Sequence, residues 1–163
     1  MTGQELLELY EAGYRTIRSN LEAISHQESM RPASEAGGNS LNWVVGHTVQ
    51  TRNVVLRLAG AEPIWDDGLM LLYSSQEDVI FDPARALPLE RLEADLDETQ
   101  VRIRAVLPRI APERLAAPAF FGTVGFTLAF LVFHEGYHSG QLGILRRLLG
   151  KPGKIKPPKI ARV

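Results

Sequence analysis

The sequence contains no cysteine among its 163 residues. Disulfide bonds, thiolate metal ligands and a cysteine nucleophile are therefore excluded together. Any metal ion must be held by histidine, carboxylate or water. An excess of charge of one sign is also lacking, because 18 Lys and Arg residues oppose 19 Asp and Glu residues and leave a formal net charge of −1. No overall field draws the chain to nucleic acid or to an anionic membrane, so we predict neither as a partner.

Segments that direct a protein to or across a membrane are lacking as well. The N-terminus has no basic and apolar regions typical of a secretory signal, which predicts a cytoplasmic protein. Residues 115–133 form an uncharged stretch of about the length that spans a bilayer. One proline, two glycines and two threonines interrupt it, and His134 and Glu135 follow directly. We therefore expect a loop that leads into a buried helix rather than a membrane span.

What the sequence does contain is helical periodicity. Apolar residues recur at spacings of three and four, the pattern of one face of an amphipathic helix, in residues 7–24, 41–58, 89–110 and 131–148. Asn39 or Ser40 can cap the second helix and Gly60 can end it, while Pro108 stops or bends the third. The last helix begins near Thr123 or Thr127. No alternating pattern bounded by hairpin turns is visible, so the fold is predicted to be all-α.

The connections between these helices predict the topology. Residues 61–87 lack a sustained period and are rich in turn-forming residues, which indicates a long connection with one short helix. Four helices joined in this way predict a four-helix bundle over residues 1–150, with a long crossover connection between helices 2 and 3. Residues 151–163 carry five basic residues, three prolines and no acid, which is typical of an extended C-terminal arm.

The aromatic residues are expected to belong mainly to the core. Two of them lie in the loop before the last helix, where they can line the mouth of a pocket. The residues concerned are Trp43, Trp65, Phe120, Phe121, Phe126, Phe130 and Phe133, with Phe120 and Phe121 in that loop.

Three of the four histidines lie on the inward stripes of predicted helices: His47 on the second, and His134 and His138 on the last. Residues four apart are neighbours on one helix face, so His134 and His138 can bind one ion. A lone buried histidine is more often a hydrogen-bonded core residue, but one divalent cation would satisfy three rings at once. His47 is the better third ligand, because His26 follows the predicted end of the first helix.

Residues 134–138 read HEGYH, which fits the HExxH pattern of zinc metalloproteases. The 25 residues after His138 contain no Asp, Glu or His to supply a third ligand, so this interpretation is disfavoured. Two roles remain open for Glu135: proton transfer at the site, or an ion pair with a basic side chain on a neighbouring helix. Gln141 shares the histidine stripe, where it can orient a ligand or substrate or simply face solvent. No catalytic residue is assigned.

The segments LNWVVGHTVQ (residues 41–50) and FHEGYHSGQLGILRRLLG (residues 133–150) resemble the DinB-like (DinB/YfiT-type) superfamily of metal-binding four-helix bundles. The helix order and the long connection match this superfamily over most of residues 1–150. The resemblance implies a divalent ion, zinc or nickel, held by His47, His134 and His138, with its remaining positions open to water or substrate.

The resemblance also implies a reaction class. Similar proteins include S-transferases and isomerases that use a low-molecular-weight thiol and act on small molecules, and similar proteins are often homodimers. We therefore expect a metal-dependent, thiol-dependent S-transferase or isomerase with a small-molecule substrate. A metal-dependent hydrolase and a non-catalytic, stress-related metal-binding protein are the alternatives.

Overall fold

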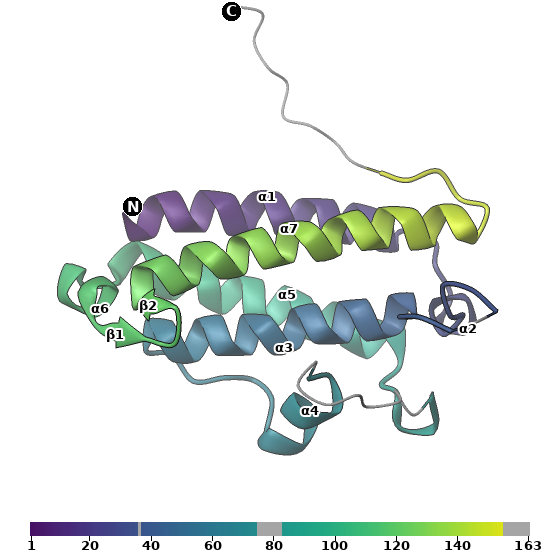
Figure 1. Ribbon diagram of the computed structural model, residues 1–163, viewed down its shortest axis with the longest axis horizontal. Coiled ribbons are helices and arrows are strands. Elements are labelled where there is room, and N and C mark those ends of the chain that lie inside the picture. Colours follow the sequence, from purple (N-terminus) through teal and green to yellow (C-terminus); the bar gives the residue numbers. More distant parts are fainter. Residues whose placement is uncertain (36, 75–82, 155–163) are drawn as a thin grey trace, which may run out of the picture.

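The computed structural model describes residues 1–35, 37–74 and 83–154 (Figure 1). Four long helices form its body: α1 (Gly3–Leu21), α3 (Leu41–Ala59), α5 (Leu89–Val106) and α7 (Val124–Leu148). The shorter elements are α2 (His26–Ser29), α4 (Asp67–Leu72), the 3-10 helices η1 (Pro83–Arg85) and η2 (Leu107–Arg109), α6 (Pro112–Ala116), and the strands β1 (Pro118–Ala119) and β2 (Gly122–Thr123). The predicted all-α four-helix bundle is confirmed.

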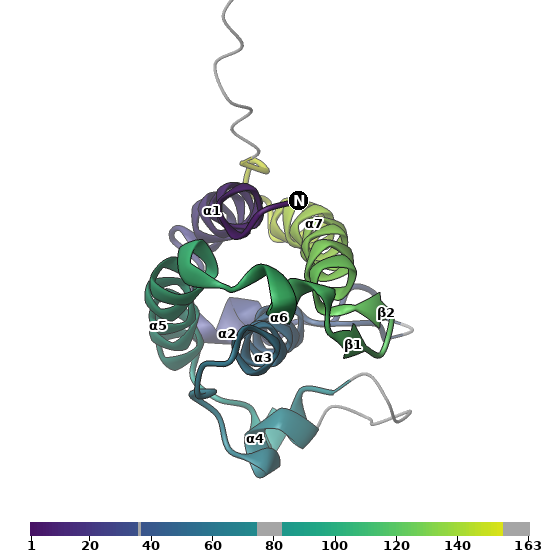
Figure 2. The same cartoon turned by 90° about the vertical axis from the view of Figure 1, so that its left-hand side faces the viewer.

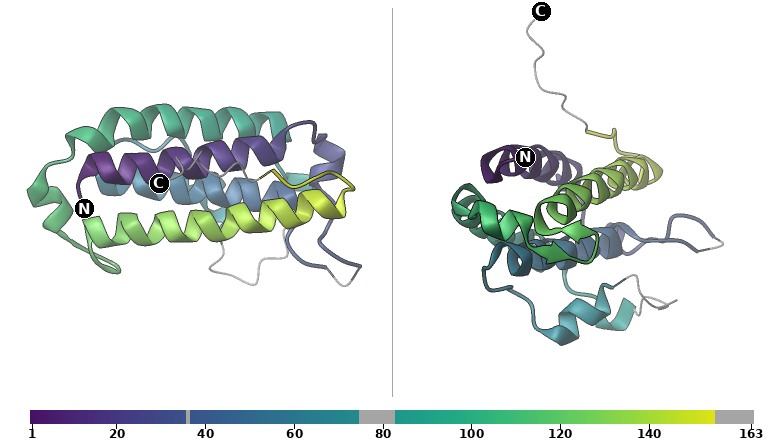
Figure 3. Two further views of the ribbon diagram at one scale, coloured as in Figure 1. Left: turned by 90° about the horizontal axis from the view of Figure 1, so that it is seen from above. Right: turned by 60° about the vertical axis from the view of Figure 1, so that its left-hand side comes forward.

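The long helices are arranged in a ring (Figure 2), in which α1 packs against α7, α7 against α3, α3 against α5, and α5 against α1. α1 and α7 run in one direction, and α3 and α5 run in the other (Figures 1 and 3). The consecutive helices α3 and α5 are therefore parallel neighbours. The chain has to travel the length of the bundle between them, which is why this connection is long and carries the extra helix α4. Residues 75–82 of the connection lie outside the described residues.

Helix boundaries follow the capping residues. Ser40, rather than Asn39, begins α3, because its side chain accepts a hydrogen bond from the backbone N–H of Trp43. Gly60 ends α3 in the left-handed conformation with φ of 85°. Thr123 begins α7 in the same way as Ser40 begins α3. α5 ends just before η2, which contains Pro108.

Some local expectations were wrong. Residues 112–123 form α6 and the β1–β2 hairpin, which the sequence did not predict because strands of two residues are too short to show an alternating pattern. His26 lies beyond the end of α1, as expected, but it begins a short helix of its own, α2, that the sequence did not predict. The aromatic residues also differ from the expectation: Trp65 is buried and Trp43 is half-buried, but the phenylalanines at positions 120, 121, 126, 130 and 133 are all exposed.

The core has two apolar clusters, one built around Ile17, Leu41 and Leu92 and the other around Leu6, Leu56 and Leu128. Along the helices, buried polar residues fall between the two clusters: Arg52, Gln100 and Glu135. Within the described residues, no helix is both long and apolar enough to cross a bilayer. The first residues of the predicted basic arm lie against the bundle, where Lys151 pairs with Glu28 and Lys154 with Glu22. Residues 155–163 of that arm lie outside the described residues.

Tyr73, which follows α4, anchors the long connection on α3. Its side chain is fully buried, and its hydroxyl donates to Asn42 Oδ1 (3.2 Å) and accepts from the backbone N–H of Leu87 (2.9 Å). A Cβ atom at Gly46 would lie 2.1 Å from carbons of the Tyr73 ring. The ring therefore reaches the α3 backbone only because residue 46 has no side chain.

Replacing Gly46 with alanine should displace the Tyr73 ring and lower the free energy of unfolding by about 1–3 kcal/mol, the usual cost of overpacking a core. The matched control is Gly143→Ala on α7, where the nearest atom to the added Cβ lies at 3.9 Å. That variant should be neutral or more stable, because alanine is the better helix former. Urea denaturation measures both, and equal effects would contradict this role of Gly46.

Candidate metal centre

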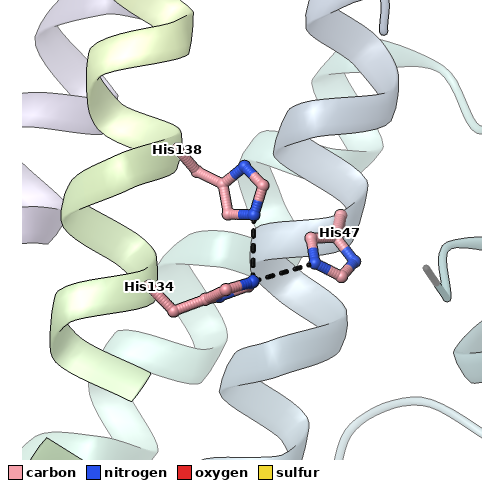
Figure 4. A group of neighbouring side chains, drawn as sticks. All are labelled: His47, His134 and His138. Atoms are coloured by element: carbon pink, nitrogen blue, oxygen red, sulfur yellow. Dashed lines mark hydrogen bonds between the residues drawn. The ribbon is translucent and has the colours of Figure 1, made fainter. Parts of the chain in front are cut away.

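The structure brings His47, His134 and His138 together (Figure 4). His47 projects from α3, and the other two project from successive turns of α7. His134 Nε2 lies 3.3 Å from His47 Nε2 and 3.1 Å from His138 Nε2. In a tetrahedral zinc site with bonds of about 2.0–2.1 Å, two ligand nitrogens are about 3.3 Å apart. These two separations suit a single ion, and the candidate ligand atoms of all three rings lie within 4.8 Å of one another.

Hydrogen bonds at the other ring nitrogen orient two of these rings. His47 Nδ1 lies 2.7 Å from the backbone oxygen of Tyr73, and His138 Nδ1 lies 2.7 Å from Gln141 Oε1. Gln141 Nε2 in turn donates to Tyr137 Oη (3.0 Å), which is consistent with its amide oxygen facing His138. Both oxygens only accept, so Nδ1 of each ring carries the proton and donates it, and Nε2 keeps a free lone pair.

This assignment leaves the cluster short of hydrogen-bond donors. His47 Nε2 and His138 Nε2 both present lone pairs to His134 Nε2, which carries one proton at most and can satisfy only one of them. If His134 uses that proton, its Nδ1, which is buried and has no hydrogen-bond partner among the described residues, keeps an unsatisfied lone pair. A cation at the centre of the cluster would satisfy all three Nε2 atoms and leave His134 Nδ1 as a donor. The donor set therefore fits a metal ion better than it fits a metal-free hydrogen-bond network.

The surroundings keep the rings uncharged. Burial lowers the pKa of His47, His134 and His138, and desolvation is the largest cause in each case. The pKa of His138 falls to about 4, although its hydrogen bond to Gln141 acts in the opposite direction. The three rings are consequently neutral at neutral pH, which is the form that binds a metal.

Two aromatic side chains border the histidines. The ring of Trp43, one turn before His47 on α3, stacks on the His47 imidazole with centroids 4.8 Å apart and planes 7° apart. Tyr137 lies edge-on to His138 with centroids 5.1 Å apart. Neither residue was assigned to the site from the sequence, although the four-residue spacing of Trp43 and His47 could have indicated that Trp43 lies beside the cluster.

Glu135 occupies a different position from the glutamate of a metalloprotease. Its carboxylate forms two hydrogen bonds with Arg52, from Nε (2.9 Å) and Nη2 (2.8 Å), and both side chains are buried. Arg52 Nη1 also donates to Gln100 Oε1 (2.6 Å). On the α1 side, a Cβ at Gly13 would lie 2.2 Å from Glu135 Oε1. Of the two roles left open for Glu135, the ion pair is the one observed.

The remaining predicted positions are also defined. His26 lies outside the cluster and accepts a hydrogen bond from the backbone N–H of Leu89 (3.3 Å). Gln141 contacts His138, as described above. Phe120 and Phe121 lie on the β1–β2 hairpin, where the Phe121 ring packs against Phe130 on the outside of α7 (centroids 4.4 Å apart).

Together, the fold and the cluster define a four-helix bundle with three histidines converging from its second and fourth long helices. The family description that matches is the DinB superfamily, over residues 9–142, and the chain belongs to this superfamily. A crystal structure described as the conserved protein of locus from Enterococcus faecalis has a similar fold, with a TM-score of 0.70 and 19% sequence identity. The alignment covers 93% of this chain and 99% of that chain. The comparison with curated proteins gave no match.

Glu135→Gln should lower the free energy of unfolding by about 3–5 kcal/mol, because it leaves the charge of Arg52 buried without its partner. Glu98→Gln is the matched control, since Glu98 pairs with Arg102 at the surface and its loss should leave stability nearly unchanged. Thermal unfolding measures both. If Glu135→Gln were as stable as the parent protein, the ion pair would not contribute to stability as predicted.

The pH dependence of the metal-free protein follows from the histidines. An unfolded histidine titrates near pH 6.5, whereas His138 in the fold titrates at about 4, so the unfolded state binds more protons between these values. Stability should therefore fall as the pH is lowered from about 6.5 to about 4. His138→Gln should flatten this part of the profile, as measured by melting temperature in the presence of a chelator. An unchanged slope would contradict the prediction.

Proposed function

We propose that this protein is a metal-dependent enzyme that conjugates a low-molecular-weight thiol to a small-molecule electrophile, as a thiol-dependent S-transferase, or that uses such a thiol to isomerise a small molecule. The metal, zinc or nickel, would be held by His47, His134 and His138. The observation that carries the proposal is the set of three Nε2 atoms that face one point without enough protons to bond one another. The reaction class rests on membership of the DinB superfamily and on the resemblance described above.

A divalent ion held by three neutral imidazoles keeps its full charge and lowers the pKa of a thiol or water that binds to it. The chain's own residues contribute orientation and shelter. The backbone oxygen of Tyr73 and the side chain of Gln141 hold two of the rings with Nε2 toward the centre. Trp43 covers one face of His47 and excludes water from it. The chain has no thiol of its own to compete with an external one.

The hydrolase alternative has less support, because the glutamate that would activate water in an HExxH enzyme is here occupied by Arg52. The non-catalytic alternative makes the ion a structural element that fixes α3 against α7. A metal-dependent enzyme and a non-catalytic metal-binding protein differ in whether an external ligand reaches the ion. The experiments are chosen to measure this.

The first measurement is the metal content of untagged protein, since an affinity tag loaded with nickel would fill the site artificially. About one divalent ion per chain is expected. His134→Ala should lose it, because two imidazoles bind a divalent ion far more weakly than three. His26→Ala is the matched control and should keep the ion. Loss of metal from His26→Ala, with retention in His134→Ala, would overturn the assignment of the ligands.

The second measurement replaces the ion with cobalt and titrates low-molecular-weight thiols while the visible spectrum is recorded. A thiolate-to-cobalt charge-transfer band should appear in the parent protein and be absent from His134→Ala. Conjugation of a small electrophile to the same thiol would then define the reaction. If no thiol changes the spectrum but an ester or amide is hydrolysed, the hydrolase is correct. If neither occurs, the ion is structural.

A further inference from the structure

A cleft opens at the end of the bundle where α3 and α5 stop and α6 begins, which is the end that faces the viewer in Figure 2. Its volume is about 730 Å³, and small-molecule pockets have volumes of roughly 300–1,000 Å³. A helix rises by about 1.5 Å per residue, so Ala59, which lines the cleft, is about 18 Å from His47 along α3. The cleft and the candidate metal centre are therefore separate sites.

The lining of the cleft has two chemically different parts. Apolar side chains of α5 and of the residues after it form much of the surface, among them Ala105, Val106 and Ile110. The charged side chains at the cleft are all guanidinium groups: Arg102, Arg109 and Arg114. Among the described residues, no Asp or Glu lines it. An apolar surface bordered by cations suits a ligand that has an apolar body and an anionic head group.

Two of these arginines are already held by other groups. Arg102 donates from Nε to Glu98 Oε1 (2.7 Å), and this carboxylate balances much of its charge. Arg114 donates from Nε to the backbone oxygen of Leu58 (2.8 Å). That oxygen lies at the C-terminal end of α3, where the helix dipole is negative. Both guanidinium groups are therefore fixed at the cleft, but neither offers a full charge to a ligand.

Arg109, the last residue of η2, differs from the other two. Its side chain is exposed and forms no hydrogen bond or ion pair with any residue that the structure describes. The cleft consequently presents one uncompensated positive charge beside two that are partly balanced. A ligand with a single negative charge, such as a carboxylate, matches this better than a doubly charged phosphate does.

We propose that the cleft binds a small carboxylate with an apolar body, of the size of a medium-chain fatty acid. The carboxylate would pair with Arg109, whose planar guanidinium group can bind both oxygens at once. The apolar body would lie against Ala105, Val106 and Ile110, which removes apolar surface from water on both sides. This site does not depend on the proposed reaction, because the lining of the cleft contains no histidine.

Binding of decanoate, measured by isothermal titration calorimetry below its micellar concentration, tests the site. Metal is first removed with a chelator, which is then dialysed away, because a carboxylate can also bind a metal ion. One decanoate per chain is expected to bind. Decanol, which has no charge, and inorganic phosphate, which has no apolar body, should each bind at least about tenfold more weakly.

Two pairs of variants locate the bound decanoate. Arg109→Gln should weaken binding at least about tenfold, because hydrogen bonds to a charged group are lost. Its matched control, Arg15→Gln, replaces an exposed arginine on α1 and should bind as the parent protein does. Ala105→Glu should weaken binding at least as much, because it places a negative charge in the cleft. Its matched control is Ala12→Glu, at an exposed alanine of α1. Circular dichroism establishes that all four variants are folded.

Several results would overturn the proposal. One is that decanoate does not bind to the parent protein. Another is that Arg109→Gln or Ala105→Glu binds it as tightly as the parent protein does, since the ligand would then lie elsewhere. Decanol that binds as tightly as decanoate would show that the arginines take no part. Phosphate that binds as tightly as decanoate would show that the apolar lining takes no part.

Discussion

The ion pair between Arg52 and Glu135 is the constraint to which the rest of the structure is fitted. Two opposite charges are buried between the two apolar clusters, and each would be costly there without the other. The pair joins α3 to α7, the same two helices that carry the histidines. A shift of either helix by one turn would break both hydrogen bonds of the carboxylate. We infer that the pair fixes the register in which His47 meets His134 and His138.

Much of this arrangement could be predicted from the sequence because it depends on helical period. The spacing of apolar residues defined the four long helices, and the same period placed three histidines on inward faces. Gly60 marked the end of α3, and the choice for its first cap was narrowed to Asn39 or Ser40, because capping is a local property. The crossover between α3 and α5 could be predicted because a connection this long is uncommon in a compact domain. In a four-helix bundle it is long enough to join two helices that run in the same direction.

What could not be predicted depends on contacts between distant segments. The acceptor for His47 Nδ1 is the backbone oxygen of Tyr73. Every residue has such an oxygen, so the residue type does not identify it, and Tyr73 lies in a segment without helical periodicity. Arg52 resembles any surface arginine until Glu135 is placed beside it. The phenylalanines were assigned to the core because hydrophobic residues are usually buried. Hydrophobicity does not distinguish a side chain that is buried inside its own fold from one that another molecule would cover. On α7 their exposure separates the two cases, and this information exists only in three dimensions.

The placement of α1 beside α7 has a consequence for the order of events during synthesis. These helices are the first and last of the four long helices that the structure describes, so the ring of four closes only after α7 has been made. His47 is then already available, but a nascent chain that has not yet produced α7 offers a single imidazole on α3, too weak a ligand to retain an ion. A chain that has not yet produced α7 would therefore lack the complete cluster that could hold an ion, and only the finished bundle could withdraw one from the cellular metal pool.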